Sequence, residues 1–394
     1  MSSLSIGLDS LRKEPPEGAA RLGWALVIAG AALAAAAYAA DPRHAAFANV
    51  VGFLFLTSVA VGSVFLIALE YIAGAVWSVP MRRVNEFLAA LVPLAALLAV
   101  PMLFRLHDLF AWMHPEALAS DAVLAAKKPY LNEGFFLVRY AVIFAVWTLF
   151  AWLFARNSLK QDLTKDESRT TANIRLAGAF LPVFAVTLTF TAIDWGMSIE
   201  PRWYSTIFGV YYFSGTVLAA VAAATFIVVR LRDSGHLPGL TRDHFYSLGA
   251  LLFAFINFWA YIAFSQFLLI WYANLPEETF WFMKHWQHGW QYVSVLLIVV
   301  HFAVPYFVLL PQEAKMDARR LKFMALWILF AHLLDLYWLV MPTYSEGVPL
   351  GWIELAFPVL IAGAAILMLS YKMKRHNLMP LGDPKLARGL EFRL

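Results

Sequence analysis

Long apolar runs, separated by short polar interruptions, follow one another along the whole chain. Ten runs have about the 20 residues that a helix needs to cross the hydrocarbon core of a bilayer. They cover residues 22–40, 47–77, 84–104, 134–155, 174–194, 206–230, 244–272, 287–310, 321–341 and 351–373. Backbone polar groups in lipid must be paired within their own segment, and no run alternates like a barrel strand. The pattern predicts an all-α integral membrane protein with ten transmembrane helices.

Composition agrees with this prediction and excludes several kinds of site. Hydrophobic residues make up 61% of the chain and charged residues only 14%, whereas about a quarter of a soluble domain is charged. The chain has no cysteine, so it holds no thiolate-ligated iron–sulfur cluster, covalently attached haem or disulfide. The longest loop, 105–133, is too short to form a domain. Any catalytic domain in water would have to belong to another subunit.

The first apolar run has a second interpretation. Arg12, Lys13 and Arg21 precede it, and the small residues that end it near position 40 are similar to a signal-peptide cleavage site. A cleavage site near residue 40 would be late for a secretory signal. We therefore interpret the run as a membrane span, with a secretory signal as the alternative.

Lysine and arginine residues lie mainly on one side of the predicted spans. Of the 30, 23 fall on the side of the N-terminus and six on the other, and Arg139 lies within a span. Because basic loops stay in the cytoplasm, this asymmetry predicts that both termini are cytoplasmic. Residues 1–21 and 374–394 are then cytoplasmic segments, and residues 22–373 form a single membrane domain.

One spacing occurs twice. An aspartate stands seven residues before a proline both at Asp194 and Pro201 and at Asp335 and Pro342. The two pairs are four spans apart, so spans two to five (about 47–194) and six to nine (about 206–341) could be two related four-helix bundles. The first and tenth spans would flank them. A single matched spacing could also arise by chance.

Ionisable residues inside membrane spans are costly and are therefore candidates for function. At 1.5 Å per residue, they lie at successive depths, from Glu70 on the N-terminal side, through the middle, to the opposite side. The candidates are Glu70, Arg139, Asp194, His301, His332, Asp335 and Glu354. This order predicts a proton path in which waters bridge the gaps. The polar residues Asn257, Ser265 and Gln266 of span seven could position those waters or could join helices.

Structural interpretations compete with this path near the membrane surfaces. Arg139 and Asp194 lie at matching depth on consecutive spans, so they could form an ion pair that locks the two helices, a proton-exchange site, or both. Glu70 could be a group that reaches from a helix end toward water, although a glutamate is short for this at its depth.

The two histidines near the middle of the membrane have three interpretations. His332 and Asp335 stand one helical turn apart and could either satisfy each other or relay a proton. His301 and His332 could instead ligate a b-type haem. Asp335 beside His332 fits a proton partner better than a haem.

The aromatic segment 274–292 is typical of a membrane–water interface. With His285 and His288, it could also form a docking surface for an external partner.

Two motifs resemble a known family. The sequence D-W-G-M-S-I-E-P-R-W-Y-S-T at 194–206 and the sequence H-W-Q-H-G-W at 285–290 are similar to the F subunit of bacterial alternative complex III, a quinol-oxidising respiratory complex. The resemblance covers essentially the whole chain. The wider superfamily is that of NrfD-like and polysulfide-reductase-like membrane subunits.

The resemblance implies two four-helix bundles with flanking helices in a bacterial inner membrane. It implies that this chain holds no cofactor or metal of its own and offers a transmembrane proton route. Quinol or menaquinol, iron–sulfur clusters and c-type haems would bind to partners: a homologous quinone-binding membrane subunit, an iron–sulfur subunit and haem c subunits. The alternatives are a subunit that itself forms the quinol oxidation site and a stand-alone secondary transporter.

Overall fold

The computed structural model describes residues 14–394, and all regular elements in this range are helical. Ten helical spans are long and apolar enough to cross a membrane, which confirms the predicted fold class. The first part of the predicted N-terminal segment, residues 1–13, lies outside the described residues. The spans are α1 (Ala19–Ala40), α2 (Pro42–Ala73), η2 with α3 and α4 (Val79–Met81, Arg82–Ala89, Val92–Leu103), α8 (Glu133–Thr164), α9 (Ser168–Trp195), α10 (Phe208–Asp233), α11 (Arg242–Ala273), α13 with η5 and α14 (Trp290–Leu297, Ile298–Ala303, Val304–Leu309), α16 (Ala318–Tyr344) and α17 (Ile353–Arg375).

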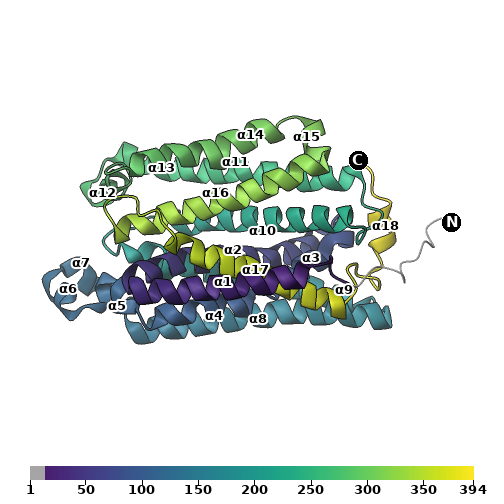
Figure 1. Ribbon diagram of the computed structural model, residues 1–394, viewed down its shortest axis with the longest axis horizontal. Coiled ribbons are helices and arrows are strands. Elements are labelled where there is room, and N and C mark those ends of the chain that lie inside the picture. Colours follow the sequence, from purple (N-terminus) through teal and green to yellow (C-terminus); the bar gives the residue numbers. More distant parts are fainter. Residues whose placement is uncertain (1–13) are drawn as a thin grey trace.

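Short helices occupy the loops at both ends of the elongated molecule (Figure 1). One end, here the terminal end, carries the C-terminus and α18 (Leu386–Leu390). The other, the loop end, carries two groups of short helices. They are α5 (Leu106–Leu109), η3 (Ala111–Met113), α6 (Pro115–Ser120) and α7 (Ala122–Lys127), together with α12 (Pro276–Lys284). The short helices η4 (Met197–Ile199) and α15 (Gln312–Met316) complete the described chain.

The spans form two four-helix bundles that share a central interface. In the first, α2 packs against α4 and α9, and α8 packs against α9; in the second, α10 packs against α11 and α16. The π-helix η5 and its neighbours α13 and α14 complete the second bundle through contacts with α11 and α16. The bundles meet where α10 and α16 pack on α2. Consequently α2 and α10 are the most enclosed spans, 89% and 83% buried over their most apolar windows.

The flanking helices α1 and α17 pack chiefly against each other. Their backbones approach so closely at Gly30 that an added Cβ would lie 2.4 Å from the backbone nitrogen of Leu360. Gly363 makes the same kind of approach, 2.6 Å from the nitrogen of Val27. The first apolar run is therefore a helix with a closely fitted partner.

The two aspartate–proline pairs differ in local structure. Helix α9 ends at Trp195, so Pro201 lies beyond it in the turn, whereas Pro342 lies inside α16. The hydroxyl of Ser198 donates to the carbonyl of Asp194 (2.6 Å) where α9 ends. The equal spacing thus does not correspond to an equal turn, although the two bundles it suggested are present.

Candidate functional site

The centre of the second bundle contains a cluster of ionisable side chains, here the middle cluster: His301, His332 and Asp335. His332 and Asp335 lie one turn apart on α16, and His301 lies on the π-helix η5. Each side chain is only 1% exposed, and one ligand-type atom from each lies within 4.8 Å of the others. A π-helical turn widens the helix and is frequent at functional sites. The structure thus brings together three residues that the sequence placed only by depth.

Asp335 is held by two aromatic donors from the neighbouring helices. The Tyr211 hydroxyl of α10 donates to one carboxylate oxygen, and Trp259 Nε1 of α11 donates to the other at 3.1 Å. The Trp259 ring also stacks on His301, with ring centroids 3.8 Å apart. The interpretation that His332 and Asp335 satisfy each other is wrong, because Asp335 takes its hydrogen bonds from Tyr211 and Trp259. Sequence reasoning missed both aromatic residues.

The imidazoles of His301 and His332 make no hydrogen bond to the described part of the chain. None of their four ring nitrogens has a partner within residues 14–394. Leaving a buried polar group unpaired costs about 1–3 kcal/mol, so such groups call for an explanation in function. A neutral imidazole beside a carboxylate can accept a proton and release it. The middle cluster therefore has the composition and the free nitrogens of a proton-transfer site.

The middle cluster has three side chains of metal-ligand type, whose ligand atoms all lie within 4.8 Å of one another. Both oxygens of Asp335 already accept hydrogen bonds. A metal bound by Asp335 would have to share its carboxylate with the two hydrogen-bond donors. Trp259 covers one face of His301, and Gly215 lies so close to His332 that an added Cβ would be 2.9 Å from Nδ1.

Hydroxyl groups line the interface between α2 and α10 near the middle cluster. Tyr212 donates to the Leu54 carbonyl at 2.8 Å, and Ser58 lies 3.2 Å from the Tyr212 hydroxyl. The Thr216 hydroxyl lies 3.3 Å from that of Ser58. Tyr212 and Thr216 directly follow Tyr211 and Gly215 along α10. This hydroxyl chain extends the polar centre toward the first bundle, and the sequence analysis did not single it out.

Arg139 and Asp194 form a bidentate ion pair near the loop end. Two guanidinium nitrogens of Arg139 donate to the two oxygens of Asp194, each at 2.8 Å. The Tyr130 hydroxyl donates to the same carboxylate at 2.9 Å, and its ring lies 3.9 Å from the guanidinium carbon. Burial and the charge of Asp194 raise the pKa of Tyr130. The structure therefore joins α8 and α9 as the matching depths predicted, and it adds a tyrosine.

The motif at 194–206 anchors the loop end. Trp195 packs on Phe53 and Phe136 at 4.8 Å between ring centroids, and Trp203 stacks on Trp281 at 4.4 Å. Lys127 Nζ donates to the Pro201 carbonyl at 2.6 Å, and burial lowers the pKa of this lysine. A mainly apolar cavity of about 500 Å³ lies between this turn and the segment 126–131. It is lined by Ala126, Lys127, Pro129, Tyr130, Leu131, Phe190, Ile193, Met197, Ser198, Pro201, Trp203 and Tyr204.

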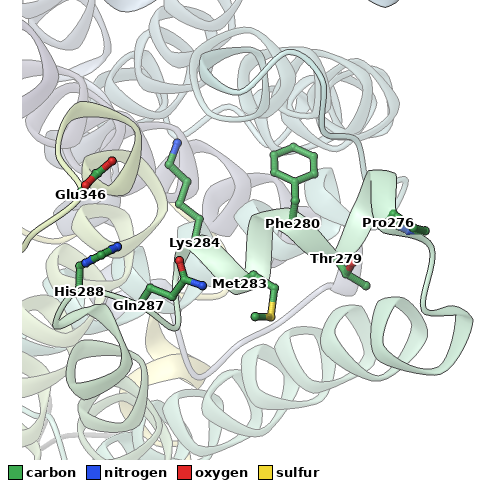
Figure 2. A pocket seen from close by; sticks show the side chains of 8 residues that line it. All are labelled: Pro276, Thr279, Phe280, Met283, Lys284, Gln287, His288 and Glu346. Atoms are coloured by element: carbon green, nitrogen blue, oxygen red, sulfur yellow. The ribbon is translucent and has the colours of Figure 1, made fainter.

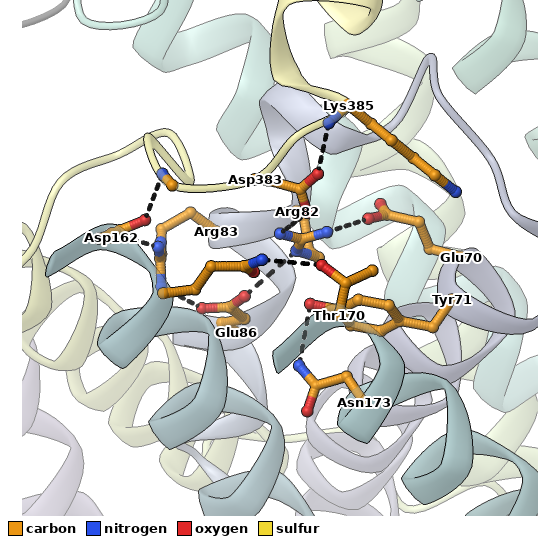
Figure 3. A network of polar contacts seen from close by, with 12 residues as sticks. Glu70, Tyr71, Arg82, Arg83, Glu86, Asp162, Thr170, Asn173, Asp383 and Lys385 are labelled. Carbon is orange, nitrogen blue, oxygen red and sulfur yellow. Dashed lines mark hydrogen bonds and ion pairs between the residues drawn. The ribbon is translucent and has the colours of Figure 1, made fainter. Parts of the chain in front are cut away.

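Glu70 belongs to a buried ion network at the terminal end (Figure 3). Arg82 donates to Glu70 at 2.8 Å and to Asp383 at 2.7 Å. The neighbouring Arg83 donates to Glu86 and Asp162, each at 2.6 Å. These six residues, here the terminal network, have side chains at most 8% exposed. Glu70 is thus not a lone carboxylate. The sequence assigned both arginines to a loop and so missed its partners.

Glu354 forms a separate pair at the loop end. It accepts a hydrogen bond from His44 Nε2 at 2.5 Å and from the Gly351 backbone at 2.9 Å. His44 also stacks on Tyr344, with centroids 4.5 Å apart. Glu354 therefore ties α17 to the start of α2.

The three polar residues of span seven have local partners. The Gln266 oxygen accepts from the Ser205 hydroxyl at 3.2 Å, which joins α11 to the 194–206 turn. Asn257 and Ser265 each donate to a carbonyl one turn back on their own helix, both at 2.7 Å. In the described part of the chain, none of these three side chains is hydrogen-bonded to the middle cluster.

The two histidines of the aromatic segment 274–292 differ in their exposure to solvent. His285 is buried, and its Nδ1 and Nε2 lie 2.6 and 3.0 Å from the Trp281 and Trp338 carbonyls. Burial lowers its pKa to about 3, so the imidazole is neutral and its single N–H can donate to only one of the two carbonyls. His285 therefore supports the fold and is not available for docking. His288 is exposed and lines a shallow cavity of about 440 Å³ with Gln287, Lys284 and Glu346 (Figure 2).

Comparison with known proteins does not identify a function for the chain. No family model matches the chain, and no curated protein matches it. The chain is a multi-pass helical membrane protein whose buried ionisable groups gather at the terminal end, the centre and the loop end.

Proposed function

We propose that this chain is a membrane subunit, without a cofactor of its own, of a quinol-oxidising respiratory complex similar to alternative complex III. In this proposal it provides a transmembrane proton path in a bacterial inner membrane, with both termini in the cytoplasm. The observation that carries the proposal is the middle cluster, in which two imidazoles without a hydrogen-bond partner among residues 14–394 lie beside a carboxylate at the centre of the bundle.

Proton transfer along this path would run through groups at three depths. The terminal network has four carboxyl groups for two guanidinium groups and so has spare acceptor oxygens. Twelve residues of α2 separate Ser58 from Glu70, a rise of about 18 Å. Water would have to connect these depths, because single side chains cannot span such a distance. Quinol or menaquinol oxidation would occur on partner subunits that carry iron–sulfur clusters and c-type haems.

A second candidate function has one observation in its favour. The cavity of about 500 Å³ beside Tyr130 is lined by aromatic and aliphatic side chains with one amine, that of Lys127. An amphipathic ring with an apolar tail, such as a quinone, suits a lining of this kind. The chain would then form a quinol site itself.

Isosteric variants of two path residues test the proposal. Asp335→Asn keeps the side-chain volume but cannot carry a proton at neutral pH, and Glu70→Gln does the same at the terminal end. We expect both complexes to assemble and oxidise quinol, with coupled proton transfer slowed by about 10²-fold or more, as for the loss of an acid–base step. The measurement is proton uptake and release in reconstituted vesicles, recorded together with the rate of quinol oxidation. Ser247→Ala is the matched control, because that hydroxyl donates to the Asp243 carbonyl of its own helix and lies outside the proposed path.

Two outcomes would contradict the proposal. Unchanged proton-to-electron ratios in both Asp335→Asn and Glu70→Gln would reduce the chain to a scaffold. Purification from the native membrane tests the partners, since haem- and iron–sulfur-bearing chains should accompany it. A chain that purifies alone and moves a solute into vesicles would instead be a secondary transporter.

A further inference from the structure

The C-terminal segment, expected to be a cytoplasmic tail, is packed across the terminal end. Residues 376–394, here the C-terminal strap, follow α17 and include α18. Leu378, Met379 and Leu386 of the strap are at most 4% exposed. A segment that buries its apolar side chains in this way is part of the folded structure.

The strap contributes directly to the terminal network. Asp383 accepts a 2.7 Å hydrogen bond from the same Arg82 guanidinium that pairs with Glu70 (Figure 3). The Gly382 backbone donates to Asp162 at 3.2 Å. The strap backbone lies so close to α8 here that a Cβ on Gly382 would be 1.9 Å from the Gln161 carbonyl oxygen.

Helix α18 covers the loop that leads from Glu70 to Arg82. It packs against η2, and a Cβ on Gly389 would lie 2.8 Å from the Val76 carbonyl. Lys385 Nζ donates to the Gly74 carbonyl at 3.1 Å. The hydroxyl oxygen of Ser78, within this loop, has no appreciable accessible surface.

The strap also binds the second bundle. His244 of α11 accepts a hydrogen bond at Nδ1 from the Thr241 backbone and donates from Nε2 to the Gly389 carbonyl at 2.8 Å. The Phe392 ring packs edge-on against the same imidazole, with centroids 5.7 Å apart. One short segment therefore ties both bundles together directly over Glu70 and Arg82.

We propose that the C-terminal strap is a closure that controls the access of water to the terminal network. It is closed while Asp383 binds Arg82 and Gly389 binds His244. When Asp383 releases Arg82, α18 lifts from the 74–78 loop and water reaches Glu70. The effect on proton entry rests on the proposed function, whereas the closure itself does not.

Thiol labelling tests the closure, because the natural chain has no cysteine. Ser78→Cys places one thiol under α18 in the full chain, and a membrane-impermeant maleimide measures its exposure in vesicles. We expect slow labelling in this background and labelling at least about tenfold faster after Asp383→Ala, since removing one partner of a buried ion pair shifts a local opening equilibrium by more than that factor. Arg388→Ala, at an exposed position of α18, is the control and should leave the rate unchanged.

A deletion of residues 377–394 and a proton measurement complete the test. Equal labelling rates in the full chain, in Asp383→Ala and in the deletion variant would overturn the closure. Thermal unfolding of each variant shows whether faster labelling comes from general unfolding, which would also count against it. Faster labelling with unchanged proton uptake in the assembled complex would overturn the control of access. A failure of the proposed function would instead be seen as normal proton-to-electron ratios in both Asp335→Asn and Glu70→Gln.

Discussion

Gly215 is the residue on which the geometry of the middle cluster most directly depends. A Cβ at this position would lie 2.7 Å from His332 Cε1. We therefore expect Gly215→Ala to displace the imidazole or shift α10, and to lower the free energy of unfolding by about 1–3 kcal/mol, as overpacking usually does. Thermal unfolding of the purified chain measures the effect. Gly178→Ala is the matched control, since its Cβ would meet only Ile72, at 4.0 Å.

A double variant separates this contact from other effects of the alanine. If the clash with His332 is the cause, Gly215→Ala should cost much less in a His332→Ala background. An equal cost in both backgrounds would show that the contact is not responsible.

At the level of single residues, the sequence identified the charged members of the sites but not their partners. Glu70, Asp335 and the two histidines stand out because ionisable residues are rare in apolar runs. Tyr211 and Trp259 do not stand out among 15 tyrosines and 15 tryptophans. Their role depends on which helices face each other, and a sequence does not state this.

At the level of elements, Pro342 and His285 form a pair that explains how α16 continues beyond Asp335. Proline has no N–H, so Pro342 leaves the Trp338 carbonyl without its partner within the helix. His285 Nε2 lies 3.0 Å from that carbonyl and donates to it in the Nε2–H tautomer, since the Trp281 carbonyl near Nδ1 already accepts from the His285 backbone. His285→Ala should therefore destabilise the chain by about 1–3 kcal/mol, because it leaves a buried carbonyl unpaired. Chemical or thermal unfolding in detergent measures this cost.

Pro342→Ala provides the missing N–H and serves as the internal control. In that background, we expect His285→Ala to cost less, since the helix can satisfy the Trp338 carbonyl itself. The same cost with and without Pro342 would mean that the imidazole acts through its ring packing on Trp281 and Trp338.

Helix positions followed from the apolar runs, while helix ends and irregular turns did not. Span two was predicted at 47–77 but begins at Pro42, where the Asp41 side chain accepts from the His44 backbone, and ends before Gly74 in a left-handed conformation. The π-helix at Ile298–Ala303 gives no sequence signal, because its apolar residues also fit an α-helix. Local capping and tertiary packing decide such details.

At the level of the whole molecule, the topology is the prediction with the widest consequences. Ser120 ends α6 in the loop that precedes α8, on the loop side, and Lys165 directly follows α8 on the terminal side. The excess of basic residues on the terminal side predicts that a reporter fused after residue 120 reads outside and one fused after residue 165 reads inside. Activity of paired periplasmic and cytoplasmic reporters measures this.

A third fusion site checks the orientation that the first two reporters indicate. The segment 345–352 joins α16 to α17 at the loop end, so a reporter there should agree with the one after residue 120. The reverse pattern at all three sites would invert the orientation and move the terminal network to the outer side.

The pairing of α1 with α17 has a consequence for biosynthesis. During synthesis, α1 emerges before the eight spans of the two bundles, and its close-fitting partner α17 emerges after them. Until then α1 has little protein surface to pack on, as only 17% of its most apolar window is buried even in the finished fold. During biosynthesis, α1 must therefore remain in the bilayer beside the assembling bundles until α17 is inserted. Without α17, Gly30 loses the Leu360 backbone that it packs against and faces lipid instead.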